Sequence, residues 1–470
     1  MTTSSPTLAI AVMAAGKGTR MKSPELPKVM HTLAGRSMVM HVLHAANQLH
    51  PEHLLPIVGH LKDKVKTHVN EKAPELMRNR LQWVEQIEQK GTGHAVQQLI
   101  PHLKDFSGQL IIINGDVPLL NASTLTDLLK KHLEEINAAT LLTTTLEDPT
   151  GYGRIVKNNA DRFLAIREHN DCTPAELRIK EVNTGIYIFN WEHLAQVLPE
   201  LQNDNAKGEY YLTDVLGILA SQRYTIGVHC MNDPSEVQGI NSRRELAYVE
   251  SLLQKRLRNY WMDMGVMLRN PDSIMLDCEV TLESNVELLP GTLLQGKTHI
   301  ESGCVIGPHS VLTDAHIGKN SVINQSVVSE SKIHDGVHIG PFAHIRPQSE
   351  VLSKARVGNF VELKNARLGT GSKASHLSYI GDAEVGEHCN IGAGTITCNY
   401  DGAHKHKTAM GDHVFVGSNS TLIAPVNLED HSYVAAGSTI TENVPAGALA
   451  LGRSRQVNKA DWVEHKRPRK

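Results

Sequence analysis

The sequence has few aromatic side chains, no long apolar run and no excess of charge of either sign. Phe, Trp and Tyr together make up 4% of its 470 residues, so aromatic rings are not the main material of its core. No apolar run approaches the ~20 residues that a helix needs to span a bilayer, which argues against a transmembrane helix. The 47 Lys and Arg residues are balanced by 50 Asp and Glu residues. This balance argues against a nucleic-acid protein held by a broad basic face.

Cysteine is also scarce and shows no paired C-x-x-C spacing. The six cysteines are Cys172, Cys230, Cys278, Cys304, Cys389 and Cys398. The N-terminal segment has no basic stretch ahead of an apolar run with a cleavage site, as a secretory signal would. We therefore expect reduced thiols and a cytoplasmic protein.

What the second half does have is a six-residue repeat. Aliphatic residues recur at this spacing at Leu282, Leu288, Leu294, Ile300, Ile306 and Leu312. The spacing slips to five in places, resumes between Ile339 and Leu363, and returns between Val416 and Ile440. Neither the 3.6-residue period of a helix nor the alternation of an ordinary strand produces a repeat of six. Glycine, which adopts turn conformations that other residues resist, often follows the aliphatic residue.

A prism with three faces accounts for this repeat. Each face takes one hexapeptide as a short strand and a turn, so that a coil uses about eighteen residues and stacks its aliphatic side chains inside. The pattern is identified as a hexapeptide parallel β-helix, a family whose coils are left-handed against the usual crossover rule. The repeat alone is equally compatible with a rigid scaffold that has no chemistry of its own.

The first part of the chain follows a different pattern, in which apolar strand-like runs alternate with amphipathic helical stretches. This alternation predicts a Rossmann-like α/β domain with a mainly parallel sheet. Further along, Leu246, Val249, Leu253 and Leu257 recur at helical spacing. We expect an α/β domain over 1–228, a linker with a connecting helix over 229–265, and a β-helix with a C-terminal tail over 266–470. The basic end of that tail is typical of a solvated terminus.

A glycine-rich loop follows the first predicted strand. Gly16-Lys17-Gly18-Thr19-Arg20 comes directly after an apolar run, and Pro27-Lys28 follows shortly after it. Backbone N–H groups at such a turn, together with basic side chains, favour a polyphosphate ligand. The loop is not a Walker motif, because Ala11 stands where that motif needs glycine. Met21 likewise breaks the dinucleotide-binding pattern.

The whole string LAIAVMAAGKGTRM with LPK resembles the signature of sugar-1-phosphate nucleotidyltransferases. Further matching segments are GTGHA at 91–95, NGDVP at 114–118, GYGRI at 151–155 and EVNTG at 181–185. With the hexapeptide repeat added, the resemblance covers nearly the whole chain. It is closest to a bacterial family of bifunctional enzymes that combine N-acetylglucosamine-1-phosphate uridyl transfer with glucosamine-1-phosphate acetyl transfer.

The chemistry of nucleotidyl transfer suits this resemblance, because it needs charge neutralisation and in-line positioning more than covalent catalysis. Asp116 ends an apolar strand at the sheet edge where open α/β folds bind ligands, and a hard cation takes oxygen ligands there. Taken alone, such an aspartate is more often a helix cap or turn residue than a metal ligand. The resemblance implies that Asp116 and Asn241 share Mg²⁺ and that Arg20 and Lys28 neutralise the triphosphate of UTP. The remaining implied nucleotide, sugar and metal contacts are Ala14, Ala15, Gly16, Gln86, Gly91, Thr92, Asn114, Gly115, Gly153, Glu168, Asn183 and Asn241.

A second group of polar residues lies where the repeat is interrupted. The series of aliphatic residues at six-residue spacing, here called the ladder, becomes irregular after Leu363. The polar segment 398–407 interrupts it. A polar loop that leaves a prism makes the wall of a cleft. His376 lies nearby and is the candidate general base, because an amine that attacks a thioester must lose a proton and imidazole titrates near neutral pH. A single histidine among 26 is ordinarily a surface residue.

The segment around His376 matches the acetyltransferase segment of the same family, in which this histidine is the base. The resemblance implies that Arg346, Lys364, Tyr379 and Asn390 hold glucosamine 1-phosphate. It implies acetyl-CoA contacts at Ala393, Asn399, Tyr400, Ser418, Ala436 and Arg453. In this family three chains pack side by side, so a homotrimer is implied as well.

These observations predict a two-domain enzyme that makes UDP-N-acetylglucosamine from glucosamine 1-phosphate, acetyl-CoA and UTP. The resemblance implies a role in supplying bacterial cell-wall precursors. We expect small-molecule substrates, no nucleic-acid partner and no membrane span. One alternative is a single-activity nucleotidyltransferase with a regulatory β-helix, as in glucose-1-phosphate adenylyltransferases. Another is a non-catalytic regulatory subunit like those of a translation exchange factor, which should have lost Lys28, Asp116 or His376.

Overall fold

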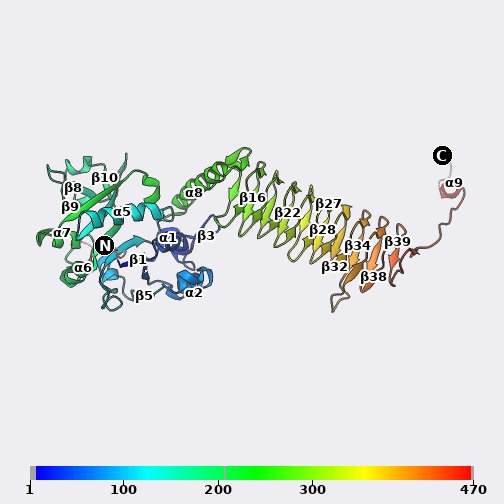
Figure 1. Ribbon diagram of the computed structural model, residues 1–470, viewed down its shortest axis with the longest axis horizontal. Helices are drawn as coiled ribbons and strands as arrows, with labels where there is room; N and C mark the ends of the chain where they lie inside the picture. Colours follow the sequence, from blue (N-terminus) through cyan, green and yellow to red (C-terminus); the bar gives the residue numbers. More distant parts are fainter. Residues whose placement is uncertain (1–6, 206–207, 467–470) are drawn as a thin grey trace, which may run out of the picture. The chain divides into compact units, whose positions relative to one another are not determined.

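The computed structural model describes residues 7–205 and 208–466, and the chain divides into two compact units between Leu253 and Gln254. Figure 1 shows an N-terminal α/β unit and a C-terminal unit made of stacked short strands. The division point falls inside the segment that the sequence marks as a linker. None of the helices in the described residues combines the length and the apolarity that a membrane crossing requires.

The N-terminal unit is built on a mainly parallel sheet in the order β11-β7-β10-β6-β1-β4-β5, with β8 and β9 added beside β10. Strand β10 runs antiparallel to both of its neighbours in this order. The strands are β1 (Leu8–Ala14), β4 (His53–Val58), β5 (Val84–Glu85), β6 (Gln109–Asn114), β7 (Ala139–Thr145), β8 (Arg154–Lys157), β9 (Phe163–Arg167), β10 (Glu181–Asn190) and β11 (Ile226–Met231). A two-stranded ribbon pairs β2 (Thr32–Leu33) with β3 (Arg36–Ser37).

Helices cover both faces of this sheet, because side chains that alternate along each strand point to opposite faces. One core cluster joins strand residues such as Ile10 and Val12 to helices α1, α2, α3 and α5. The other joins Ala9 and Ala11 to α4, α6 and α7. The helices that pack on the sheet are α1 (Met38–Asn47), α2 (Lys62–Lys72), α3 (Glu75–Arg78), α4 (Thr92–Gln97), α5 (Ala122–Glu134), α6 (Trp191–Val197) and α7 (Asp214–Ser221). Two further α-helices follow in the chain, α8 (Arg243–Asp263) and α9 (Trp462–Lys466).

The C-terminal unit is a prism with three parallel sheets, here called the first, second and third faces. The first face contains β12 (Met267–Leu268), β15 (Glu287–Leu288), β18 (Val305–Ile306), β21 (Val322–Ile323), β24 (His338–Ile339), β27 (Arg356–Asn359), β30 (Lys373–His376), β33 (Asn390–Ile391), β36 (Phe415–Val416), β39 (Tyr433–Val434) and β41 (Leu449–Ala450).

The second face contains β13 (Met275–Leu276), β16 (Leu293–Gln295), β19 (Val311–Thr313), β22 (Val327–Ser329), β25 (His344–Ile345), β28 (Glu362–Lys364), β31 (Tyr379–Gly381), β34 (Ile396–Cys398), β37 (Thr421–Ile423) and β40 (Thr439–Ile440). The third contains β14 (Thr281–Leu282), β17 (His299–Ile300), β20 (His316–Ile317), β23 (Lys332–Ile333), β26 (Glu350–Val351), β29 (Arg367–Leu368), β32 (Ala383–Val385), β35 (Thr408–Met410) and β38 (Val426–Leu428).

The six-residue ladder forms the core of the prism, as the sequence predicts. Leu288, Leu294, Ile300 and Ile306 are fully buried in a single continuous cluster. The glycines that follow ladder residues allow adjacent coils to approach closely. A Cβ on Gly358 would lie only 1.9 Å from the backbone oxygen of Ser375 on the next coil. Spacing between coils therefore depends on the absence of a side chain at that position.

Candidate active sites

The glycine-rich loop begins where β1 ends, at the carboxyl end of the parallel strands. Gly18 has a φ of 62°, and a Cβ there would lie 2.5 Å from Cβ of Lys28. The loop therefore packs directly against the residue that carries the second basic group of the motif. Ala15 is held from the other side, because its carbonyl oxygen accepts a hydrogen bond from Nε2 of Gln89 at 2.7 Å.

Four charged or polar side chains of the nucleotidyltransferase motif meet beside this loop. Lys28 Nζ pairs with the Asp116 carboxylate, and it donates a hydrogen bond to Oδ1 of Asn241 at 2.7 Å. Nη2 of Arg20 donates to the same Asn241 oxygen at 2.8 Å. The side chains of Lys28 and Asp116 are only 12% and 24% exposed. The structure thus brings Asn241 to Asp116, as the resemblance implies, although the two residues are far apart in sequence.

Backbone contacts at the start of α8 hold Asn241 in place. The N–H of Ile240 donates to the carbonyl oxygen of Asp116 at 3.1 Å. Ser242 and Glu245 form a reciprocal capping box, in which each backbone N–H bonds to the other side chain. The Glu245 carboxylate also accepts from the N–H of Asn241 at 2.6 Å. The beginning of this helix therefore positions the amide that faces Asp116.

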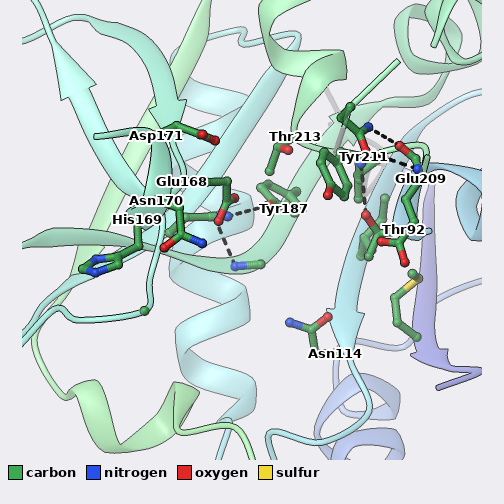
Figure 2. Close-up of a pocket in the computed structure, with 17 residues that line it drawn as sticks. Thr92, Asn114, Glu168, His169, Asn170, Asp171, Tyr187, Glu209, Tyr211 and Thr213 are labelled. Carbon is green, nitrogen blue, oxygen red and sulfur yellow. Dashed lines mark hydrogen bonds between the residues drawn. The ribbon is translucent and has the colours of Figure 1, made fainter. Parts of the chain in front are cut away.

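A cleft of about 860 Å³ opens beside these groups in the N-terminal unit. Figure 2 shows Glu168, Asn170 and Asp171 on one wall and Thr92 and Glu209 on the opposite wall. Its lining includes four of the residues that the sequence singles out: Thr92, Asn114, Glu168 and Asn183. A cleft of this size holds a ligand as large as a nucleotide sugar.

The base of the cleft is built from close backbone approaches. Gly115 donates from its N–H to the carbonyl oxygen of Met13 at 2.9 Å, which ties the Asn114-Gly115-Asp116 segment to β1. The side chain of Asn114 donates to the carbonyl oxygen of Thr184 at 3.3 Å. Nearby, Nε2 of the buried Gln86 donates to the carbonyl oxygen of Gly91 at 3.0 Å. Gln86 and Gly91 are therefore joined behind Thr92, which lines the cleft.

Glu168 and Asn183 lie together on the far wall with Gly153 between them. A Cβ on Gly153 would lie 3.3 Å from Oε1 of Glu168 and 3.7 Å from Cβ of Asn183. The backbone N–H of Asn183 donates a hydrogen bond to the carbonyl oxygen of Gly153 at 2.8 Å. The side-chain amide of Asn183 donates to the Tyr187 hydroxyl at 2.8 Å. Burial raises the pKa of Tyr187 well above its ordinary value, so this hydroxyl stays neutral. Neutral hydrogen-bonding groups next to a carboxylate suit a sugar ring with several hydroxyls.

Part of this lining carries none of the motifs seen in the sequence. His169, Asn170, Asp171, Glu209, Tyr211 and Thr213 also face the cleft. The first three follow Glu168 directly, so their position was readable from the chain. Glu209, Tyr211 and Thr213 lie in an irregular segment before α7, and no motif marks them.

In the C-terminal unit, His376 ends β30 at a corner of the prism. Asn359 occupies the same position one coil earlier, and the two residues are paired in register. Nδ1 of His376 donates to Oδ1 of Asn359 at 2.6 Å. This bond places the proton on Nδ1 and leaves a lone pair on Nε2 of the exposed imidazole. The sequence marked His376 but not its partner.

Two cations lie next to each other on the second face. Arg346 and Lys364 each follow a buried ladder residue, Ile345 and Leu363, which are neighbours in register. Nη1 of Arg346 pairs with the Glu362 carboxylate at 2.8 Å, and Nζ of Lys364 lies 3.8 Å from Asp382. Because both side chains remain half-exposed, they can also bind an anionic ligand.

Asp382 links these cations to the polar loop. Its carboxylate accepts hydrogen bonds from the side-chain amides of Asn365 and Asn399. Burial works to raise the pKa of Asp382, but these two hydrogen bonds and the Lys364 charge outweigh it and hold the pKa below its ordinary value. The Asn399 amide also lies 3.5 Å from the Tyr379 hydroxyl. Asn399 and Tyr379 thus share a hydrogen-bonded cluster with Asp382.

The structure places Asn390 apart from this cluster within one chain. Asn390 begins β33 on the first face, whereas Tyr379 begins β31 on the second face. His376 lies at the corner between the two faces, where Leu377 has a φ of 49°. The predicted sugar-phosphate contacts are therefore divided between two faces of a single prism.

Most of the predicted acetyl-CoA contacts form a column that continues from His376. Ala393, Ser418 and Ala436 each stand two residues after a ladder residue of the first face, and those ladder residues are paired in register. Arg453 lies three residues beyond Ala450, which continues the same register. Tyr400 lies outside the column on a loop, is 61% exposed, and donates from its hydroxyl to the carbonyl oxygen of Gly402.

Comparison with known proteins agrees with this arrangement of two units. Residues 9–272 match the family described as nucleotidyl transferase, and residues 408–442 match the hexapeptide repeat of succinyl-transferase. A protein of a Nostoc species named "Bifunctional protein GlmU" is 48% identical over 96% of this chain and 98% of its own length. A protein of the same name from Brevibacillus brevis is 46% identical over 98% of this chain and 97% of its own length. The chain belongs to the family of bifunctional GlmU proteins, with a nucleotidyl transferase unit and a hexapeptide-repeat unit in one polypeptide.

Proposed function

We propose that this chain makes UDP-N-acetylglucosamine in two transfers, acetyl transfer to glucosamine 1-phosphate and then uridyl transfer from UTP to N-acetylglucosamine 1-phosphate. The observation that carries the proposal is the presence of two separate groups of reactive residues, one in each unit. Lys28, Asp116 and Asn241 meet in the first unit, and His376 with Asn359 stands on the second. Because UTP and acetyl-CoA are both consumed, we place the reaction in the cytoplasm.

In the acetyl transfer, His376 acts as the general base. The amine nitrogen of glucosamine 1-phosphate attacks the thioester carbonyl carbon, the C–S bond breaks and the CoA thiolate leaves. Nε2 of His376 takes the proton from the attacking amine, because Nδ1 is already committed to Asn359. The half-exposed cations Arg346 and Lys364 bind the sugar phosphate, with Tyr379 and Asn390 holding the ring. The column of Ala393, Ser418 and Ala436 receives acetyl-CoA.

In the uridyl transfer, a phosphate oxygen of N-acetylglucosamine 1-phosphate attacks the α-phosphorus of UTP. The bond to the departing pyrophosphate breaks, and negative charge shifts to that group. Arg20, on the loop after β1, and Lys28, which packs against that loop, neutralise this charge. Gln86, Gly91 and Thr92 bind the nucleoside on one wall. Glu168 and Asn183 line the other wall and bind the acetylated sugar, together with the adjacent Gly153.

The reaction is metal-dependent, and Mg²⁺ is the ion that we propose. A Cβ on Gly239 would lie 4.0 Å from Oδ2 of Asp116 and 3.9 Å from the Asn241 amide nitrogen, so both side chains converge there. Carboxylate and amide oxygens are the ligands that a hard cation prefers, so Asp116 and Asn241 fit Mg²⁺. A bound Mg²⁺ supplies positive charge to the phosphates. In this structure Lys28 Nζ contacts both oxygens, and this convergence of two oxygens on a positive charge supports the proposed site.

We further propose that the chain works as a homotrimer joined through the prism. Phe342, Phe360 and Leu377 occupy corner positions on consecutive coils and are 53%, 55% and 62% exposed. The two phenyl rings stack with centroids 5.5 Å apart. An exposed apolar column of this kind suits burial against another copy. A neighbouring chain would also supply groups to a sugar-phosphate site whose members lie on two faces.

The trimer is tested by analytical ultracentrifugation of the full chain. Wild-type protein is expected to sediment as a trimer, and Phe360→Asp is expected to shift it toward the monomer. Phe163→Tyr, a conservative change in the other unit, is the control that keeps the trimer. A monomeric wild type would contradict the proposal.

The two activities are tested by incubating the purified chain with glucosamine 1-phosphate, acetyl-CoA, UTP and Mg²⁺ while free thiol and pyrophosphate are followed separately. Thiol release without UTP is expected, and pyrophosphate is expected only once the acetylated sugar phosphate is present. Pyrophosphate formation from glucosamine 1-phosphate without thiol would instead support a single-activity nucleotidyltransferase with a regulatory β-helix. The absence of both thiol and pyrophosphate, in a sample of folded protein, would support the non-catalytic alternative.

A further inference from the structure

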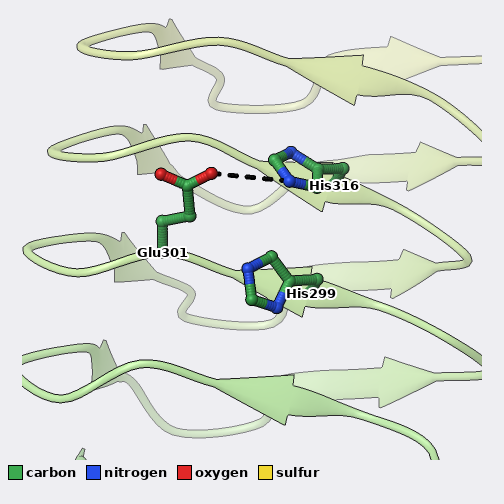
Figure 3. A group of neighbouring side chains, drawn as sticks. All are labelled: His299, Glu301 and His316. Carbon is green, nitrogen blue, oxygen red and sulfur yellow. Dashed lines mark ion pairs between the residues drawn. The ribbon is translucent and has the colours of Figure 1, made fainter.

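Two histidines and a glutamate come together on the third face of the prism, away from the residues assigned to acetyl transfer. His299 on β17 and His316 on β20 occupy the same register position on adjacent coils. Their ring centroids are 5.1 Å apart, and Glu301 projects beside them, as Figure 3 shows. All three side chains are half-buried, and one ligand atom of each lies within 4.8 Å of the other two. Across residues 7–205 and 208–466, no other set of three His, Cys, Asp or Glu residues meets this spacing.

One nitrogen of His299 is already fixed by a neighbour. Its Nδ1 bonds to the Thr281 hydroxyl, which stands at the same register position one coil earlier, at 2.7 Å. When Nδ1–H donates to that oxygen, the lone pair resides on Nε2. A hydrogen bond of this kind is the usual support of a metal-binding histidine, because it sets the tautomer and the orientation of the ring.

His316 lacks such a fixed partner and is the least satisfied member of the group. Its buried Nδ1 has no hydrogen-bond partner among the described residues. Its Nε2 makes only a 3.4 Å contact with Oε1 of Glu301.

Two neighbouring basic side chains, Lys332 and His334, are not part of this group of three residues. Lys332 follows His316 in register on the next coil, on the opposite side from His299. His334 is engaged by its own carboxylate, with Nε2 2.7 Å from Oε1 of Glu350. The carboxylate of Glu301 lies beside the two imidazoles, as Figure 3 shows.

We propose that His299, Glu301 and His316 bind one divalent transition-metal ion, with Zn²⁺ as the best match. Two imidazole nitrogens and one carboxylate oxygen form a mixed donor set that Zn²⁺ accepts readily, whereas Mg²⁺ prefers oxygen alone. Three protein ligands leave a fourth position for water or another ligand. The ion would join two coils of the prism, so its binding stabilises this part of the fold. The site is separate from the uridyl-transfer group, which uses oxygen ligands in the other unit.

The test is Zn²⁺ titration of the full chain by calorimetry, after chelation and in excess Mg²⁺ to fill the oxygen-ligand site. Wild type is expected to bind one more Zn²⁺ per chain than either His299→Ala or His316→Ala. Glu301→Gln is expected to weaken that binding by at least about tenfold. His338→Ala, which removes an exposed histidine from the first face, is the matched control and should behave as wild type.

Substituting Co²⁺ provides a second readout, because an imidazole-bound Co²⁺ gives visible absorption bands that depend on its ligands. These bands are expected in wild type and in His338→Ala and are expected to be absent in His316→Ala. Melting curves in chelator check that each variant is folded. If His316→Ala fails this check, His316→Gln takes its place with the same expected loss. Unchanged Zn²⁺ stoichiometry and affinity in both folded histidine variants would overturn the proposal, as would the absence of Zn²⁺ binding by wild type.

Discussion

Asn359 and His376 are joined by a 2.6 Å hydrogen bond between equivalent positions on adjacent coils of the prism. The prism itself therefore orients the proposed base, since the distance between coils sets the distance between the two side chains. A neutral amide can fix the tautomer without adding a charge to the imidazole. The pair provides a direct test of the acetyl-transfer proposal.

We expect His376→Ala to lower kcat for acetyl transfer by about 10²–10⁴-fold, the range of a lost general base. Asn359→Ala should cause a smaller loss and change the pH dependence of kcat, because Nδ1 loses its acceptor. Uridyl transfer measured on the same samples should stay at the wild-type rate. Equal loss of both activities in a folded variant would contradict the assignment to two sites.

The complementary change is Asp116→Ala in the first unit. Removal of this carboxylate takes away the group that Lys28 and Asn241 surround, so uridyl transfer should fall to background while acetyl transfer persists. Lys28→Ala is expected to have the same effect through loss of charge neutralisation. Lys22→Ala, an exposed cation near the same loop, serves as the control and should retain pyrophosphate formation.

Acid should destabilise the N-terminal unit through His132. This residue is 1% exposed and bonded to Thr140 and Gln109, and burial lowers its pKa to about 4. Because the unfolded chain binds the proton more readily, the free energy of unfolding should fall as pH drops from 6.5 toward 4. The loss from this residue reaches up to about 3 kcal/mol. Chemical denaturation at a series of pH values should show a flatter profile for His132→Gln, and an unchanged slope would contradict the prediction.

Close packing between coils predicts that Gly358→Ala destabilises the prism. The new Cβ would lie 1.9 Å from the Ser375 carbonyl oxygen, so the coils must separate locally. We expect a loss of at least about 1 kcal/mol, seen as a lower melting temperature. Gly217→Ala in α7 is the contrast, because no atom lies within 4 Å of its added Cβ. Alanine in a helix interior should be neutral or stabilising there.

Much of this architecture was determined by local sequence. The six-residue ladder predicts the prism, because each strand buries the residue that the period selects, as at Ile300 and Ile317. The strand and helix alternation predicts the α/β unit, in which apolar runs form strands such as β6 (Gln109–Asn114). The loop at 16–20 identified the nucleotidyltransferase family through residues close together in the chain.

The tertiary structure decided which distant side chains meet. Asn241 bonds to Lys28 although the two residues are 213 positions apart in the chain. They meet because the capped start of α8 lies at the edge of the sheet. No periodic pattern in the sequence predicts this contact. On the prism, side chains that lie next to each other can almost be predicted from the sequence. His299 and His316 each precede a ladder residue, and those two ladder residues are three steps of the ladder apart. Yet the coils vary in length, so only the observed register shows that His299 faces His316 and that Asn359 faces His376. Local sequence patterns therefore predict the two units and the family, because they depend on residues close together in the chain. The contacts that carry the chemistry depend on strand register and on the long-range folding of α8 onto the sheet.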